Sequence, residues 1–246
     1  MVNLLYTELL KLKRSNMFLI SMIGATVSPL MMAIATYMHI QTKPSAPETM
    51  DFYTFFINVN LYTVLVIGVP LYGVVTAYLF NREYTENTLK NLLTIPVSRF
   101  HLILSKFLLL FIWIMILTIV AWGLALLFGV LLSLPGLSSF LLLQSFMKFL
   151  MAGGLLFLLS TPMVLLTLVM KTYVPPIILT IVITMINVMI ANSEHKDLFP
   201  WTAILDIVNN ELQLTYPPEY SYVIVTATSI IGFLTTIFYF KKVDIH

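Results

Sequence analysis

The sequence predicts an all-α membrane protein with six transmembrane helices. Of its 246 residues, 59% are hydrophobic and only 10% are charged, whereas a soluble domain carries about 25% charged residues. The apolar residues form long uncharged runs, and about 20 such residues suffice for a helix to cross the hydrocarbon core of a bilayer. Lysine and arginine concentrate in alternate loops, as expected for a chain that crosses several times. We therefore expect one transmembrane domain over 1–246.

The uncharged runs place the six spans in order along the chain. They cover about 17–37, 58–80, 107–132, 144–170, 175–192 and 220–240. In the second span, polar Asn58 and Asn60 indicate that the buried part begins near Leu61. The run from Phe107 to Met147 provides most of two spans, and Pro135-Gly136 predicts the turn between them.

The basic residues orient these spans, because lysine and arginine accumulate in cytoplasmic loops. A cytoplasmic amino terminus puts ten of the 13 basic residues inside, namely Lys11, Lys13, Arg14, Arg82, Lys90, Arg99, Lys106, Lys171, Lys241 and Lys242, and leaves Lys43, Lys148 and Lys196 outside. A cleaved signal peptide is the alternative for the first run, since Ala33-Ile34-Ala35 resembles a cleavage site. That run is longer than a signal core, which favours a span.

Residues 1–16 predict an amphipathic helix that lies at the membrane surface. Leu5, Leu9 and Leu12 recur on one helical side, and Lys11 and the basic residues after it point away from that side. Such a helix buries its apolar face at the acyl boundary and places its cations near anionic headgroups. The alternative is a basic flank that only fixes the topology.

The cytoplasmic stretch 81–106 predicts a short, stiff coupling helix between the second and third spans. Arg82, Glu86 and Lys90 repeat every four residues, a favourable charge ladder on one helical face. Pro96 lacks an N–H and ends this helix, and Ser98 can cap the helix that follows. The helix also carries an apolar patch formed by Leu89, Leu92 and Leu93. Because this stiff helix is joined directly to two spans, it can transmit a mechanical displacement to them.

The outer stretch 193–221 is too apolar and aromatic for a solvated loop. We expect two short helices that dip into the outer leaflet, with Trp201 and Tyr216 as aromatic anchors at headgroup level. Asp206 and Glu211 are expected to face outward. The segment is well placed to act as an outer gate, or alternatively only to seal the leaflet.

Catalytic machinery is not expected in this chain. The sequence contains no phosphate-binding loop, no zinc-protease or serine-hydrolase motif, and no cysteine. Its four histidines are scattered, so we expect no catalytic residue, metal site or cofactor. The net charge of +2 does not indicate the strongly basic surface that nucleic-acid binding requires.

Ion-coupled transport is disfavoured, because buried ionisable residues normally serve it and none lies clearly at mid-membrane. Lys148, near the outer end of the fourth span, either snorkels to the interface or contacts an anionic cargo.

The stretch 80–106 resembles the signature region of ABC-2 type transporter permeases. That pattern is an acidic residue, G-T-L, two leucines, P-x-S-R and a lysine entering the third helix. The matching residues are Glu83, Thr88, Leu89, Leu92, Leu93, Pro96, Ser98, Arg99 and Lys106, with Asn87 in place of the usual glycine. The amino-terminal stretch 3–15 is similar to bacterial permeases of bacitracin and lantibiotic self-protection systems.

The resemblance implies a multi-pass protein of the bacterial cell membrane that pairs with a second permease. Each permease would dock a separate ABC ATPase through the helix at about 82–95, so that ATP and Mg belong to two ATPase copies. The residues implied in docking are Glu83, Glu86, Thr88, Leu89, Leu92, Leu93, Pro96 and Arg99.

The leading hypothesis is the permease of an ATP-driven exporter for an antimicrobial peptide, an antibiotic or a lipid-linked cargo, giving resistance or self-immunity. A second hypothesis is a non-transporting sensor or assembly partner of a cytoplasmic ATPase. A secondary transporter is the third.

Overall fold

The computed structural model describes residues 2–13, 15–42, 50–85, 98–209, 216–217 and 219–242. Every regular element in these ranges is a helix, which confirms the all-α prediction. The helices are α1 (Val2–Lys13), α2 (Asn16–Thr42), α3 (Phe52–Tyr62), the π-helical η1 (Thr63–Gly68), α4 (Val69–Thr85), α6 (Arg99–Leu131), α7 (Ser139–Leu159), α8 (Thr161–Met170), α9 (Val174–Ile190), the 3-10 helix η2 (Lys196–Leu198), α10 (Pro200–Asn209) and α11 (Glu219–Lys242).

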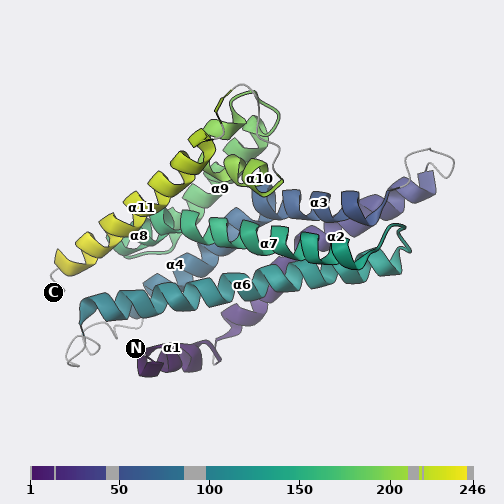
Figure 1. Ribbon diagram of the computed structural model, residues 1–246. Coiled ribbons are helices and arrows are strands. Elements are labelled where there is room, and N and C mark those ends of the chain that lie inside the picture. Colours follow the sequence, from purple (N-terminus) through teal and green to yellow (C-terminus); the bar gives the residue numbers. More distant parts are fainter. Residues whose placement is uncertain are drawn as a thin grey trace.

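Five helical stretches are long and apolar enough to cross a membrane. They are Asn16–Thr42, Phe52–Thr85, Arg99–Leu131, Ser139–Met170 and Glu219–Lys242. The expected fifth span corresponds to α9, an apolar helix of 17 residues. In Figure 1 the long helices run side by side, with α1 and the carboxyl end of α11 at one end of the bundle and the α6–α7 turn at the other.

Burial in the second span begins earlier than the sequence suggested. Phe52, Phe55 and Phe56 are at most 2% exposed, so the expected start near Leu61 is wrong. The α6–α7 turn covers this end, because the Phe52 amide donates to the Pro135 carbonyl at 3.0 Å. A Cβ at Gly129 of α6 would lie 2.3 Å from the Phe52 ring, so glycine permits the contact.

The predicted helix start after Ser98 and the predicted turn at Pro135-Gly136 are confirmed, whereas the fourth helix begins at Ser139, earlier than the expected start at about 144. The Ser98 hydroxyl accepts a hydrogen bond from the His101 amide and starts α6, and Ser138 caps α7 in the same way through Leu141. The turn between them passes through Gly136 at φ 88°, a left-handed conformation that favours glycine. Side-chain caps and a glycine turn thus fix where one long apolar run folds back.

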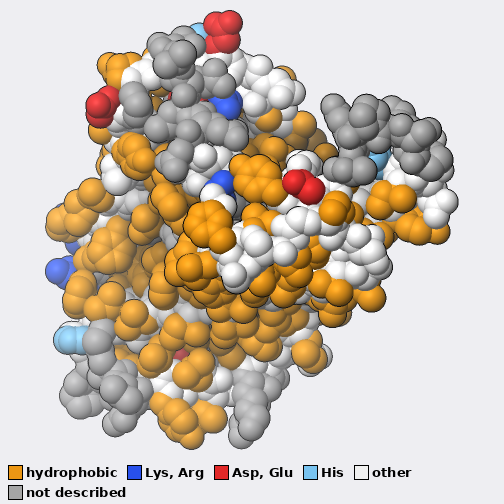
Figure 2. Space-filling view, turned by 45° about the vertical axis from the view of Figure 1, so that its right-hand side comes forward, with side chains coloured by type: hydrophobic (Ala, Val, Ile, Leu, Met, Phe, Trp, Pro, Cys, Tyr) orange, Lys and Arg blue, Asp and Glu red, His pale blue; other side chains and the backbone are white. Residues whose placement is uncertain are grey.

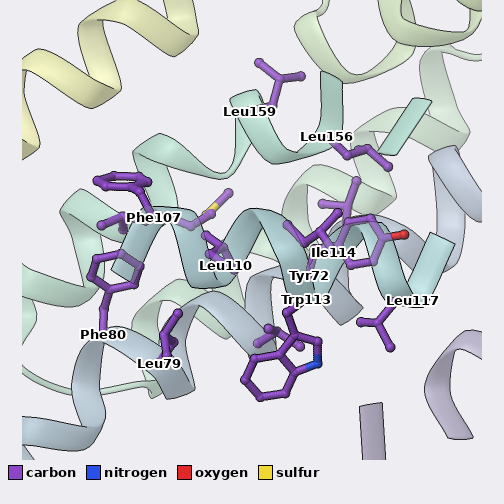
Figure 3. Close-up of a cluster of buried hydrophobic side chains, with 14 of the residues drawn as sticks. Tyr72, Leu79, Phe80, Phe107, Leu110, Trp113, Ile114, Leu117, Leu156 and Leu159 are labelled. Atoms are coloured by element: carbon purple, nitrogen blue, oxygen red, sulfur yellow. The ribbon is translucent and has the colours of Figure 1, made fainter. Parts of the chain in front are cut away.

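A large apolar core joins α4, α6 and α7. Figure 3 shows Tyr72 of α4 and Trp113 and Ile114 of α6 packed together with side chains of α7. The close approach of α6 and α7 depends on Gly153, where a Cβ would lie 2.5 Å from the Thr118 hydroxyl oxygen. Small residues serve this purpose in membrane helix packing.

The surface is apolar over most of the face seen in Figure 2. Large side chains such as Met189, Leu131 and Ile23 are 82%, 71% and 67% exposed. Such exposure would be unfavourable in water, by about 25 cal/mol per Å², but costs nothing against lipid. The chain is a multi-pass membrane protein.

Candidate functional site

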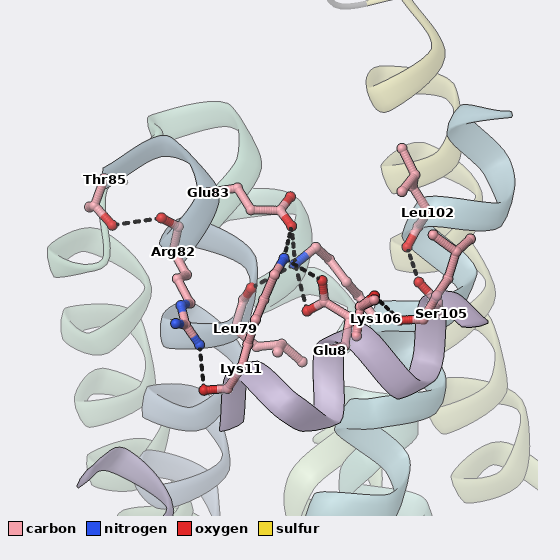
Figure 4. A network of polar contacts seen from close by, with 11 residues as sticks. Glu8, Lys11, Leu79, Arg82, Glu83, Thr85, Leu102, Ser105 and Lys106 are labelled. Atoms are coloured by element: carbon pink, nitrogen blue, oxygen red, sulfur yellow. Dashed lines mark hydrogen bonds and ion pairs between the residues drawn. The ribbon is translucent and has the colours of Figure 1, made fainter. Parts of the chain in front are cut away.

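Four charged side chains form a buried cluster at the end of the bundle that carries α1 (Figure 4). Lys106 of α6 places its Nζ 3.0 Å from Glu83 Oε1 of α4 and 3.4 Å from Glu8 Oε2 of α1. Lys11 of α1 places its Nζ 2.7 Å from Glu8 Oε1 and 3.4 Å from Glu83 Oε1. Lys106 also donates to the Leu79 carbonyl at 3.2 Å. We call these residues, Glu8, Lys11, Glu83 and Lys106, the ion cluster.

The ion cluster is balanced, with two carboxylates against two ammonium groups. The side chains of Glu8, Glu83 and Lys106 are only 10%, 7% and 8% exposed. Burial by itself raises the pKa of Glu8, but the charges and hydrogen bonds of Lys106 and Lys11 outweigh it and hold that pKa below its usual value. Burial lowers the pKa of Lys11, and the two glutamates reverse this and raise it. Both shifts favour the charged forms of Glu8 and Lys11.

Two further contacts extend this polar end. Arg82 Nη1 donates to the Lys11 carbonyl at 3.1 Å, and its guanidinium carbon lies 5.9 Å from the ring centre of Tyr78. Arg99 Nη1 donates to the Lys241 carbonyl of α11 at 3.3 Å. Side-chain contacts thus join α1, α4, α6 and α11 at one end of the bundle.

The ion cluster brackets the predicted coupling helix. Glu83 lies three residues before the stretch 86–97, and Lys106 lies nine residues after its end. Since breaking a buried pair leaves an uncompensated charge at a cost of about 3–5 kcal/mol, the cluster holds both flanks of this stretch against α1.

Of the predicted docking residues, the structure describes Glu83 and Arg99. Glu83 is 5% exposed and belongs to the ion cluster. Glu86, Thr88, Leu89, Leu92, Leu93 and Pro96 lie outside the described residues.

The partner of Glu83 and Lys106 in α1 was missed from the sequence. Glu8 was given no role, and Lys11 was expected to point away from the apolar side, which is wrong because its side chain is only 30% exposed. One signal was available: Glu8 is the single acidic residue before Glu48, in a segment otherwise basic, three residues ahead of Lys11. A single carboxylate in an otherwise basic segment is typical of a residue that forms a specific ion pair.

The two aromatic residues of the predicted outer segment lie in different surroundings. Trp201 packs against the apolar core and beside Phe199, with ring centres 5.5 Å apart. Tyr216 shares a hydrogen bond of 2.8 Å between its hydroxyl and His195 Nδ1. The expected short helices appear as η2 and α10, whose residues Ala203, Ile204, Ile207 and Val208 are buried.

Lys148 of α7 contacts the same segment. Its Nζ donates to Asn209 Oδ1 of α10 at 3.2 Å and lies 5.8 Å from the ring centre of Tyr53. The small cavity that these residues line has a free volume of about 10 Å³, roughly the space of one water.

Asp206 does not face outward as expected; it is 2% exposed, and its Oδ1 accepts from Lys196 Nζ at 2.6 Å. The amphipathic register of α10 turns this carboxyl toward η2. Burial raises the pKa of Asp206 to about 6, a shift that Lys196 opposes and Asp197 reinforces. Glu211 lies outside the described residues.

This shift predicts a pH dependence of stability. Because the pKa of folded Asp206 exceeds its usual value of 3.8, its contribution to stability is full below pH 3.8 and is lost as pH rises through about 6. The melting temperature of the wild type should therefore fall relative to that of Asp206→Asn between pH 4 and 7.

Asp51 provides the control, since the Thr54 amide lowers the pKa of that carboxyl. Its contribution is present above the usual pKa and lost as pH falls, so Asp51→Asn should show the opposite trend. Parallel pH profiles for the wild type and Asp206→Asn would contradict the assignment.

Known proteins resemble this chain over most of its length. The family described as ABC-2 family transporter protein matches residues 4–187, which include most of α1 and most of α9. The chain is also 55% identical over 191 residues to the bacitracin transport permease protein BCRB of Bacillus licheniformis, covering 78% of this chain and 92% of that protein. A resemblance carried by the stretch 80–106 thus extends through the bundle. This chain belongs to the ABC-2 family of transporter proteins.

Proposed function

We propose that this chain is the permease subunit of an ATP-driven exporter that removes an antimicrobial peptide, an antibiotic or a lipid-linked cargo from the membrane. Membership of the ABC-2 family and the similarity to a bacitracin transport permease support the class of transporter and of cargo. The observation that carries the proposal is the ion cluster, because it joins both flanks of the predicted coupling helix to α1.

In this proposal the chain crosses the membrane six times, with its amino terminus in the cytoplasm. The contacts of Lys11, Arg82, Lys106, Arg99 and Lys241 support one common basic end. The sixth crossing is α9, whose 17 residues extend about 25 Å at 1.5 Å per residue, close to the roughly 30 Å of the hydrocarbon core.

ATP hydrolysis belongs to a separate partner in this proposal. Two ABC ATPase copies, each with ATP and Mg, dock on a pair of permeases, and the second permease is another copy of this chain or a close relative. The residues proposed for docking are Glu83, Glu86, Thr88, Leu89, Leu92, Leu93, Pro96 and Arg99.

The test is to express this chain with an ABC ATPase subunit as its candidate partner and to purify both in lipid nanodiscs. We expect the two to copurify, and we expect bacitracin, used as the probe, to raise ATP hydrolysis several-fold. Cells that express the pair should tolerate more bacitracin than cells that express either alone. Copurification with neither stimulation nor protection would instead favour the sensor or assembly partner.

We further propose that the outer segment gates cargo exit, with Trp201, Tyr216 and Lys148 as its residues. The support is its position: α10 packs against α7 and α11, and Lys148 ties α7 to Asn209 at its end. Replacing Trp201 and Tyr216 with alanine should abolish protection while ATPase binding stays near wild type and the protein stays folded at the assay temperature, even though the lost packing of Trp201 lowers its melting temperature. If the variant does not stay folded at that temperature, or if protection does not change, the segment is structural.

A further inference from the structure

An apolar groove opens between α6 and α11 at the half of the bundle nearest α1. Its walls are Leu104, Leu108 and Phe111 on α6 and Ile230, Phe233 and Leu234 on α11, and its floor is the α7–α8 junction. The volume is about 530 Å³. Along α6 the walls extend seven residues, or about 10 Å, within the roughly 15 Å of one bilayer leaflet.

The lining presents hydrocarbon to whatever enters. Thr161 and Ser229 are its two hydroxyl side chains. Thr161 Oγ1 donates to the Leu158 and Ser229 carbonyls, and Ser229 Oγ donates to the Val225 carbonyl at 2.7 Å. An occupant therefore gains from burying apolar chain there and not from hydrogen bonding.

Positive charge gathers where the groove reaches the end of the bundle. Lys241 lies seven residues after Leu234, and this spacing returns it to the same face of α11. Lys241 and Lys242 are both exposed, and the Lys241 carbonyl accepts from Arg99 Nη1, so that the start of α6 lies beside them. The amino end of a helix also carries partial positive charge that favours anions.

We propose that this groove is a binding site for an anionic glycerophospholipid of the membrane. One acyl chain fills the groove between α6 and α11, and the phosphate lies beside Lys241, Lys242 and Arg99. The occupant must combine a long hydrocarbon with an anionic head about two helical turns away, and a lipid of the adjacent leaflet has this form. The proposal does not depend on the transported cargo.

The test measures lipids retained by the full-length protein in native mass spectrometry. The probes are dioleoyl phosphatidylglycerol and dioleoyl phosphatidylcholine in equal amounts, which have the same chains and differ in head charge. A lysine near an anionic lipid surface contributes a factor of about five in binding. We expect the wild type to prefer phosphatidylglycerol by that factor or more, and the double variant Lys241→Gln/Lys242→Gln to lose most of the preference.

Matched controls separate the head site from the groove. Lys171→Gln removes an exposed lysine of the α8–α9 turn and should keep the preference. Ile230→Trp should reduce retention of both lipids by filling the groove, whereas Ile231→Trp, on an equally exposed residue outside the lining, should not.

Three results would overturn the site. If the Lys241→Gln/Lys242→Gln and Lys171→Gln variants prefer phosphatidylglycerol to the same extent, the lipid phosphate does not lie beside Lys241 and Lys242. Equal retention in Ile230→Trp and Ile231→Trp would exclude the groove. A changed dimer fraction in Ile230→Trp, without loss of lipid, would make the groove an interface between copies.

Discussion

Replacing Lys106 with methionine should destabilise the protein by about 3–5 kcal/mol. Its Nζ lies between Glu83 and Glu8, and the Lys106 side chain is 8% exposed. Methionine fills similar space but leaves two buried carboxylates with Lys11 as their remaining partner in the ion cluster. The melting temperature of the purified protein should fall accordingly, and α1 should become more accessible to protease.

Two matched variants give this prediction its specificity. Lys171→Gln removes an exposed lysine and should change the free energy of unfolding by no more than about 0.5 kcal/mol, as surface changes usually do. Adding Glu83→Gln to Lys106→Met removes one of the uncompensated charges, so the double variant should regain part of the lost stability. A Lys106→Met protein as stable as Lys171→Gln would show that the cluster does not hold this end together.

Replacing Leu92 and Leu93 with aspartate should abolish copurification of the ATPase. These residues belong to the predicted apolar patch of the coupling helix, and buried, unpaired charge in an interface costs several kcal/mol. At ~1.4 kcal/mol per factor of ten, that loss lowers affinity more than a hundredfold. The permease itself should still insert, since every span is unchanged.

Leu137→Asp is the matched control for the connector. Leu137 is 44% exposed in the α6–α7 turn at the opposite end of the bundle. This variant should copurify the ATPase as the wild type does. If the Leu92→Asp/Leu93→Asp protein does so too, the coupling helix is not the docking surface, and the ion cluster would need another role.

The helices and turns of this protein were determined by residues that are close together in the sequence. Long uncharged runs can be stable only as lipid-facing helices, because a bilayer offers no partners to backbone N–H and C=O groups. Ser98 was readable as a helix start and Pro135-Gly136 as a turn, since capping and left-handed backbone are properties of a few neighbouring residues. The stretch 80–106 resembled the ABC-2 pattern for the same reason: its residues are contiguous.

The tertiary structure decided which distant polar groups meet. Glu8 and Lys106 are separated by 98 positions, and no periodicity relates them; they meet because α1 folds back beneath α4 and α6. Asp206 was expected at the surface because aspartate is usually solvated, yet packing of α10 buries it beside Lys196. Apolar burial can be read from the sequence because it depends on residue type and period, whereas a buried charge is tolerated only where a specific partner from another helix reaches it, and only the folded chain specifies that partner.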